Sequence, residues 1–181
     1  MYELKNDEFY ELIDTYSHNV IDYCILKDSE PYSGEDSHRK ALAAVMHKYA
    51  EFDLYYDVDC ATAVSVSSAE LLALPEPTWR TERKGRNVTV EVTYNIRVDG
   101  GEIPYWQAFM KPPCGEYQTE DFMRVNSALF NAGTDHLEIL KWSTDWAEYF
   151  DDGREWWGTL CVTVYDRNLD RYVVITAAAT D

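Results

Sequence analysis

Few residues of this chain have the types and spacing that catalysis requires. Cys114 is the best candidate nucleophile, because it lies in the loop sequence PPCGEY beside a glycine, with His136 further along the chain. Asp57 and Asp59 alternate and would share one face of a strand, whereas Asp53 and Asp57 would share one face of a helix. Either pair could hold a divalent cation. In a chain with 33 Asp and Glu residues, however, such pairs are also expected without any function.

The sequence motifs of the common enzyme classes are missing. No HExxH sequence, phosphate-binding glycine loop or GxSxG sequence is present. The four cysteines, Cys24, Cys60, Cys114 and Cys161, lie far apart without a CxxC pair, which argues against a zinc site and against a disulfide framework. We therefore predict a protein with four free thiols and without catalytic residues, bound metal, cofactor or small-molecule substrate.

Charge is the strongest signal in the composition. The chain holds 33 acidic and 16 basic residues, which give a formal net charge of −17. The acidic excess covers residues 1–78 and 99–181, whereas residues 79–98 contain five Lys and Arg but only two Asp and Glu. Such a protein repels nucleic acid over most of its surface and is attracted to basic surfaces. The same charge also promotes solubility, which is the alternative reason for it.

Acidic residues recur in tight groups beside aromatic residues. Carboxylates held on a rigid surface can occupy a channel built for phosphates, and neighbouring rings can supply the desolvated contacts of an interface. We therefore predict partner-binding residues in two of these groups: Asp53, Asp57, Asp59, Glu148, Asp151, Asp152 and Glu155. The alternative is a solvated acidic face whose rings belong to the core.

The one basic segment, TWRTERKGR at residues 78–86, is expected to form a loop ahead of a strand. Its Arg80, Arg83, Lys84 and Arg86 could contact a phosphate backbone. They could also pair with acidic residues of the same protein or remain solvated, which is the commoner outcome for a small isolated group. If the contact is functional, an acidic body would face a basic partner and the small basic loop would touch that partner's nucleic acid.

The hydrophobic pattern predicts an α+β fold. Apolar residues at intervals of three and four predict helices, alternation predicts strands, and Gly and Pro mark turns. The expected elements are helices at 9–24, 37–52, 68–74, 119–133 and 143–150, and strands at 61–66, 87–98, 103–110, 136–142, 156–166 and 171–181. A turn at 99–101 should pair strand 87–98 with strand 103–110, and the last two strands should form a C-terminal β-hairpin. The prediction is a single domain, residues 1–181, with N-terminal helices packed on one face of an antiparallel sheet of about five strands.

The stretch EYFDDGREWW at residues 148–157 leads into the last hairpin. Trp156 shares strand parity with Leu160 and Val162, which predicts that it packs inward, whereas Trp157 belongs to a more mixed face. The charged residues of this stretch are then expected to form a rigid acidic turn on an aromatic base.

No run of about 18 apolar residues is present, so no membrane-spanning segment and no membrane partner are expected. The N-terminal sequence MYELKNDEFYEL is acidic and amphipathic and has no signal-peptide pattern. A cytoplasmic location is therefore predicted.

A strongly acidic, single-domain chain of this size without catalytic motifs is similar to the small inhibitors carried by phages and mobile elements. Together with the acidic and aromatic stretch DWAEYFDDGREWWGTLCVTVYD and its closing hairpin, the chain most resembles a type II-A anti-CRISPR protein from a Firmicute phage or mobile element. These proteins share no common motif, so the resemblance transfers no functional residue.

The resemblance implies a non-catalytic inhibitor in the cytoplasm of a bacterial host. Its partner would be a type II Cas nuclease in complex with guide RNA, and binding would block DNA binding or cleavage by occupying the nuclease's positively charged channel. Contact with the preformed complex through both the acidic body and residues 80–86 is the alternative site of action. Two other functions stay open: an acidic interaction or immunity protein for another basic nucleic-acid-binding partner, and a Cys- or metal-dependent hydrolase.

Overall fold

A six-stranded antiparallel sheet forms the centre of this computed structural model, which describes residues 1–5, 8–49, 53–96 and 100–179. Its strands are β1 Tyr2–Glu3, β2 Ile21–Lys27, β3 Ala63–Ser65, β6 Leu137–Trp142, β7 Thr159–Asp166 and β8 Arg171–Ala178. They lie in the order β1–β2–β8–β7–β6–β3, and every neighbouring pair is antiparallel.

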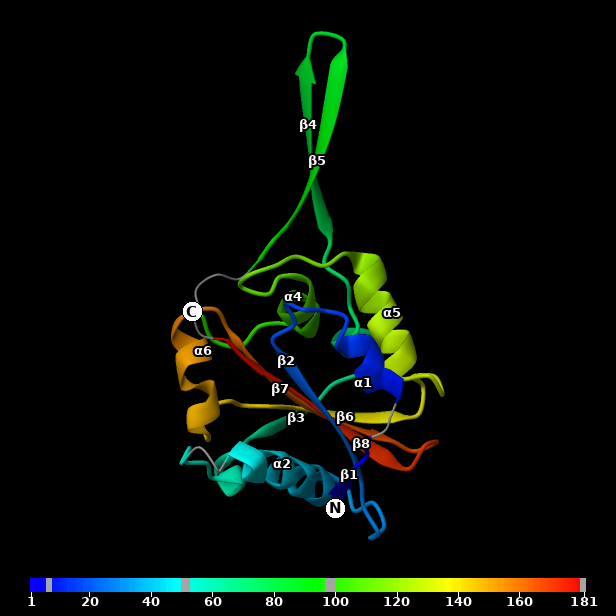
Figure 1. The fold of residues 1–181 in the computed structure, drawn as a ribbon, viewed down its shortest axis with the longest axis vertical. Helices are drawn as coiled ribbons and strands as arrows, with labels where there is room; N and C mark the ends of the chain where they lie inside the picture. Colours follow the sequence, from blue (N-terminus) through cyan, green and yellow to red (C-terminus); the bar gives the residue numbers. More distant parts are fainter. Residues whose placement is uncertain (6–7, 50–52, 97–99, 180–181) are drawn as a thin grey trace.

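Helices cover both faces of this sheet (Figure 1). One face carries α1 Glu8–Ile13, α3 Ser68–Leu71, α4 Tyr105–Met110 and α5 Thr119–Leu129. The opposite face carries α2 Glu35–Tyr49 and the 3-10 turns η2 Val58–Cys60 and η3 Glu148–Phe150. The short helix α6 Asp151–Glu155 follows η3 directly and lies beside the end of β8, where Gly153 packs against Ala178.

The two central strands show why both faces must be covered. Along β7, Leu160 and Val162 contribute to the core beneath α1, α4 and α5, whereas Cys161 and Tyr165 contribute to the core beneath α2. All eight residues of β7 are buried, and β8 is buried except at Ala178. A strand that is apolar on both sides must be covered on both sides.

The α+β class, the antiparallel sheet and the C-terminal β-hairpin are confirmed. Two details of the prediction need correction: the sheet has six strands, and the helices do not share one face, because α1 and α2 pack on opposite faces. None of the helices in the described residues is long and apolar enough to cross a membrane.

The predicted first helix, residues 9–24, is wrong beyond its first turns. α1 ends at Ile13, and the Thr15 hydroxyl donates to the carbonyl oxygen of Leu12 at 2.7 Å. The chain then forms β2, which pairs with β8 from Ile21 to Leu26. Apolar residues at these positions fit either structure, and pairing with a central strand outweighs the local preference for helix.

The largest correction concerns the basic segment. Residues 78–86 do not form a loop, because β4 Pro77–Lys84 pairs with β5 Asn87–Tyr94 along its whole length. The two strands are joined by a two-residue loop in which Gly85 has a φ of +63°, as a type II′ hairpin turn requires at its first central position. This projecting hairpin, residues 77–94, extends away from the body (Figure 1), and every side chain of β4 is exposed.

The predicted partner of β5, residues 103–110, is helical instead. It forms α4, all six residues of which are buried. The glycines of the predicted turn lie against the body: the Gly101 N–H donates to the carbonyl oxygen of Arg154 at 3.0 Å, and Thr159 N–H donates to the carbonyl oxygen of Gly101 at 2.7 Å. β5 ends at Tyr94, so Asn95 and Ile96 do not continue the predicted strand, and residues 97–99 lie outside the described residues.

Several local predictions are confirmed. α2 and α5 form where helices were expected, although residues 50–52 lie outside the described residues. Ser67 caps α3 by accepting from the Glu70 N–H. The expected strands at 61–66 and 136–142 appear as β3 and β6. The helix predicted at 143–150 is reduced to η3, and α5 ends at Leu129 rather than near Gly133.

The predicted orientation of the two tryptophans before β7 is wrong. Trp156 is 64% exposed, whereas Trp157 is half-buried and packs against the core beneath α4. The Trp157 indole N–H donates to the carbonyl oxygen of Lys111 at 3.1 Å. Strand parity does not apply here, because α6 ends only at Glu155 and β7 begins at Thr159.

Candidate interaction surfaces

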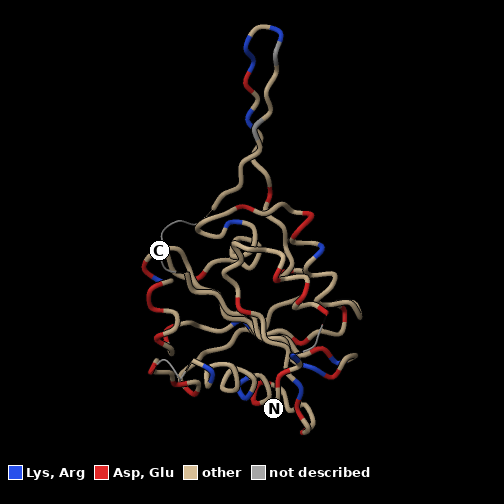
Figure 2. Tube along the Cα trace, viewed as in Figure 1, with Lys and Arg blue, Asp and Glu red and all other residues tan. Residues whose placement is uncertain are grey.

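The two predicted acidic groups are brought together by direct backbone pairing. Glu148 N–H donates to the carbonyl oxygen of Tyr55 at 3.0 Å, and the Glu148 carboxylate accepts from Tyr55 N–H at 2.8 Å. Asp57 N–H donates to the carbonyl oxygen of Trp146 at 2.9 Å. Residues 55–57 therefore run alongside residues 146–148, and α6 follows this segment directly after η3. Residues 53–59 and 145–155 are together called here the acidic surface (Figure 2).

Packing against α2 fixes the position of the η2 side of this surface. Arg39 of α2 donates to the carbonyl oxygens of Val58 and Ala61 and pairs with Glu35. Its guanidinium lies 4.9 Å from the centroid of the Trp142 ring, which is fully buried. The half-buried guanidinium is therefore used inside the fold.

The predicted acidic residues differ in what they do on this surface. Asp57 is half-buried and caps η2 by accepting from Asp59 N–H at 3.1 Å. Asp151 pairs with Arg154, which also donates to the carbonyl oxygen of Thr144. The remaining predicted residues on the acidic surface are exposed: Asp53, Asp59, Glu148, Asp152 and Glu155.

Sequence reasoning missed Asp145 on this surface. Asp145 is exposed and lies close enough to Cys60 to contribute to its electrostatic environment, together with Asp57 and Asp59. The Cys60 thiol donates to the Asp57 carboxylate at 3.2 Å. That hydrogen bond, followed by the neighbouring negative charges, raises the pKa of the Cys60 thiol above its ordinary value. The carboxylates of the acidic surface thus shift the pKa of a thiol that lies on the same surface.

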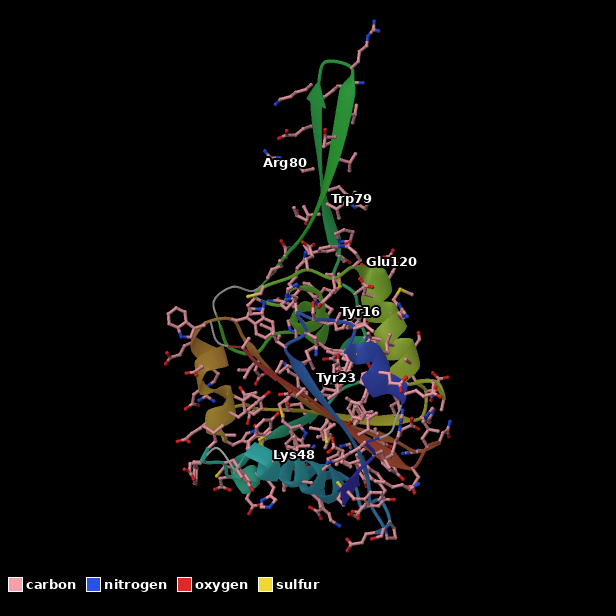
Figure 3. All side chains as sticks on the ribbon, viewed as in Figure 1. Tyr16, Tyr23, Lys48, Trp79, Arg80 and Glu120 are labelled. Carbon is pink, nitrogen blue, oxygen red and sulfur yellow. The ribbon has the colours of Figure 1, made fainter. Side chains whose placement is uncertain are left out.

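The predicted basic residues lie on the projecting hairpin, and its two faces differ. Directly opposed residues of an antiparallel pair share one face. One face therefore carries Arg80, Glu82 and Lys84 with Thr78, Thr89 and Thr93, and the other carries Trp79, Thr81 and Arg83 with the valines of β5. Figure 3 shows Trp79 and Arg80 on opposite sides of the hairpin.

The basic side chains are mainly solvated. Arg80 lies 3.9 Å from Glu82 in an exposed ion pair, and no ion pair of Arg83 or Lys84 is found among the described side chains. Such a pair contributes little to stability in water. The tip, with Gly85-Arg86 at the turn, is therefore a small region of positive charge held away from an acidic body (Figure 2).

One aromatic residue holds the base of the hairpin. Tyr94, at the end of β5, lies with its ring 6.4 Å from that of Trp106 in α4, and the Lys111 ammonium lies 5.7 Å from the Tyr94 ring centroid. Apart from the half-buried Tyr94, every described side chain of the hairpin is exposed. The hairpin is thus fixed at its base and exposed along the rest of its length.

The candidate nucleophile and its candidate base do not form a pair. Cys114 is exposed, and the ring next to its loop belongs to His18, because a Cβ on Gly115 would lie 2.7 Å from the Cβ of His18. His136 instead interacts with Asp166 at 2.8 Å and with Asn168 at 3.0 Å in the turn between β7 and β8. All four cysteines are free thiols, as predicted.

An open groove of about 450 Å³ lies between the α3 segment and α5. Leu72, Leu74, Phe122 and Phe130 form much of its lining, and none of its lining residues is titratable. Within the described residues, no group of three or more His, Cys, Asp or Glu side chains is arranged to hold a metal ion. The groove could take an apolar group but offers no acid–base chemistry of its own.

Comparison with known proteins adds no relative: no protein-family model, curated protein or solved structure matches this chain.

Proposed function

We propose that this protein is a non-catalytic inhibitor that binds a type II Cas nuclease loaded with guide RNA. The acidic surface would dock on the positively charged channel that the nuclease uses for nucleic acid, and the bound protein would block DNA binding or cleavage. The proposed setting is the cytoplasm of a bacterial host that carries a phage or mobile element.

The observation that supports this proposal is the merger of the two acidic groups into one surface. Residues distant in sequence, such as Asp59 and Asp152, are exposed on adjoining segments that hydrogen bonds hold together. A rigid array of carboxylates can replace phosphates opposite lysine and arginine side chains without paying the ordering entropy of a flexible acidic tail. Charge of this kind mainly increases the association rate, so the affinity should depend strongly on salt.

The projecting hairpin would provide a second contact. Its basic tip would touch the guide RNA or the DNA of the complex while the acidic surface contacts the protein. The two contacts carry opposite charge and lie on different parts of the molecule, so each can be removed alone. Binding to another basic nucleic-acid-binding protein is the second candidate, and the same acidic surface would serve it.

The test compares two triple variants with the same change in charge. Asp53→Asn, Asp59→Asn and Asp152→Asn together remove three exposed carboxylates from the acidic surface. Glu8→Gln, Glu11→Gln and Asp14→Asn remove three exposed carboxylates at α1, on the opposite face of the sheet. Binding to guide-loaded type II nuclease is measured at low and at physiological salt, together with inhibition of DNA cleavage.

We expect the acidic-surface variant to bind at least about tenfold more weakly at low salt, and the α1 variant to change affinity by less than about twofold. Wild-type affinity should fall as salt increases. Equal loss in both variants would mean that only net charge matters and would refute the proposed surface. Failure of the wild-type protein to bind any guide-loaded type II nuclease, while it captures another nucleic-acid-binding protein, would replace the Cas nuclease by the second candidate.

A further inference from the structure

The projecting hairpin carries an apolar stripe that nothing in the described chain covers. Trp79 is 65% exposed, Val88 and Val90 are each 53% exposed, and Val92 is 41% exposed. Trp79 pairs with Val92, Thr81 with Val90 and Arg83 with Val88, so all these side chains lie on one face. These four residues, Trp79, Val88, Val90 and Val92, are referred to below as the apolar stripe.

This exposure needs an explanation, because a two-stranded hairpin is marginally stable in water unless its apolar face is packed. The exposed fractions correspond to on the order of 400 Å² of apolar surface, and contiguous patches of that size usually mark an interaction site. The opposite face of the same hairpin, with Arg80, Glu82 and Lys84, is polar throughout its described side chains. Alternation of apolar and polar residues along β5, with Trp79 of β4 on the same face as its valines, is the pattern of a sheet that is buried on one side only.

We propose that the apolar stripe binds the apolar stripe of a second copy of this chain. The two hairpins would pack face to face and antiparallel around a two-fold axis that passes near the central pair, Thr81 and Val90. In this arrangement the Trp79 ring of each copy lies over the valines near the tip of the other. The polar faces remain in solvent on the outside.

Charge complementarity favours this arrangement. Antiparallel packing brings the basic tip of each hairpin, with Arg83 and Arg86, to the base of the partner hairpin. That base is flanked by two exposed acids: Glu76, which immediately precedes β4, and Glu120 in the first turn of α5. Figure 3 shows Glu120 at the end of the body from which the hairpin leaves. Tip and base thus attract each other across the two-fold axis, whereas a parallel arrangement would bring like charges together.

The projection of the hairpin also reduces the cost of association between two acidic molecules. The hairpin, residues 77–94, carries four basic and two acidic residues, whereas the whole chain has a net charge of −17. Contact through the hairpins is therefore the arrangement in which the acidic surfaces stay apart. Nucleic acid is the poorer match for this face, because valine side chains offer no donor to phosphates or base edges.

The interface should be weak. The two stripes alone bury less than the roughly 800 Å² per partner of a standard interface, and the contacts between tip and base supply the rest. We expect a dissociation constant on the order of 10 µM that increases with salt.

Sedimentation equilibrium of the full chain tests this, over protein concentrations from about 1 to about 200 µM. Val90→Glu places a charge in the centre of the apolar stripe, and Thr89→Glu places the same charge on the opposite face of the same strand. Both positions are exposed, so neither change disturbs the core. We expect wild type and Thr89→Glu to dimerise and Val90→Glu to associate at least tenfold more weakly.

Disulfide trapping provides a second measurement that does not depend on weakening the hairpin. In a background with Cys60→Ser and Cys114→Ser, which removes both exposed thiols, Thr81→Cys should form an intermolecular disulfide on mild oxidation. Glu82→Cys, on the other face, should form it at least tenfold more slowly. A wild-type protein that stays monomeric at the highest concentration, or Val90→Glu dimerising as wild type does, would overturn the proposal. So would equal trapping at positions 81 and 82. Loss of nuclease inhibition in the acidic-surface variant leaves this result unaffected, because the two surfaces share no residue.

Discussion

Acid should destabilise this protein through one buried imidazole. His38 of α2 is fully buried against the sheet, with Nδ1 2.8 Å from the Thr163 hydroxyl and Nε2 3.2 Å from the Tyr32 hydroxyl. The Trp142 indole N–H donates to the same Thr163 oxygen at 2.8 Å. Burial disfavours the charged ring and lowers the pKa of His38 from 6.5 to about 4, although Glu35 opposes this shift.

The size of the effect follows from this pKa. In the unfolded chain His38 takes up a proton near its ordinary pKa of 6.5, whereas in the folded protein it does so only near 4. Between these values the unfolded state binds more protons, so the free energy of unfolding falls as the pH falls. This decrease in the free energy of unfolding is absent above pH 6.5 and approaches about 3 kcal/mol near pH 4.

Urea unfolding at several pH values from about 8 to about 4.5 measures this dependence, with His38→Gln as the test and His47→Gln as the control. His47 lies in the same helix but is exposed. Both variants share the general effect of protonating carboxylates, so that effect cancels in the comparison. We expect the His38→Gln variant to lose less stability in acid than wild type, by about 2 kcal/mol between pH 7 and 4.5, and His47→Gln to follow wild type.

The reasoning is refuted if His38→Gln and wild type show the same dependence of unfolding free energy on pH. His38→Gln should be less stable than wild type at pH 8, because the smaller side chain leaves unfilled space and a weaker hydrogen bond. This loss of stability at pH 8 does not affect the comparison, which concerns how the unfolding free energy of each protein changes with pH. Only the difference between the two slopes bears on the imidazole.

Two further predictions test the acidic surface and the chain path. Cys60 should react with the anionic reagent 5,5′-dithiobis(2-nitrobenzoate) more slowly than Cys114, because adjacent carboxylates raise the pKa of the Cys60 thiol and repel the reagent. Added salt should reduce the difference between the two rates. Equal rates at low salt would contradict the prediction. Gly100→Ala should lower the unfolding free energy by about 3 kcal/mol or more, because its φ is +72° and a Cβ would lie 2.1 Å from a carbonyl oxygen of α6. Gly85→Ala, at φ +63° with open space around it, should cost only about 1–2 kcal/mol in a thermal melt, and a reversed order would contradict the assigned path.

Much of the fold was predictable because local signals and tertiary packing agree over most of its length. α2 and α5 have clear helical periodicity, and the turn between β7 and β8 joins two strands of strongly β-forming residues. The first predicted helix failed because the spacing of Ile21 and Cys24 suits a helix as well as a strand. Only the presence of β8 as a pairing partner decides between them, and β8 is about 150 residues away in the sequence.

The partner of β5 was predicted wrongly for a different reason. Asp99-Gly100-Gly101 looks like a stronger turn signal than Lys84-Gly85-Arg86, so β5 was assigned to the wrong neighbour. Gly100 is needed instead for close approach of the backbone to α6, and the backbone of Gly101 is hydrogen-bonded to Arg154 and Thr159. TWRTERK contains only one large apolar residue, Trp79, so β4 shows no alternation of its own, and its charge made it look like a loop.

For the candidate surfaces, the sequence could supply the residues but not their proximity. Nothing in the spacing of Asp59 and Asp152 places them on adjoining segments; the pairing of residues 55–57 with 146–148 does. Asp145 was missed although it lies in the same predicted helix as Glu148, three residues before it. Contacts of this kind are decided by loop packing, for which single-sequence patterns carry little information.

The hairpin is the part of the chain in which local pattern and global fold are least connected. Apart from Tyr94, its described side chains contribute nothing to either core. Yet apolar and polar residues alternate along β5 as they do in a half-buried sheet, and Trp79 of β4 lies on the same face as the valines. Folding of the body does not require that alternation, so the burial that it implies must come from outside the chain. A chain in which residues 78–93 are replaced by a short glycine–serine linker should therefore fold with an unchanged sheet and an intact acidic surface. Any activity that this shortened chain retains can be assigned to the acidic surface, and any that it loses can be assigned to the hairpin.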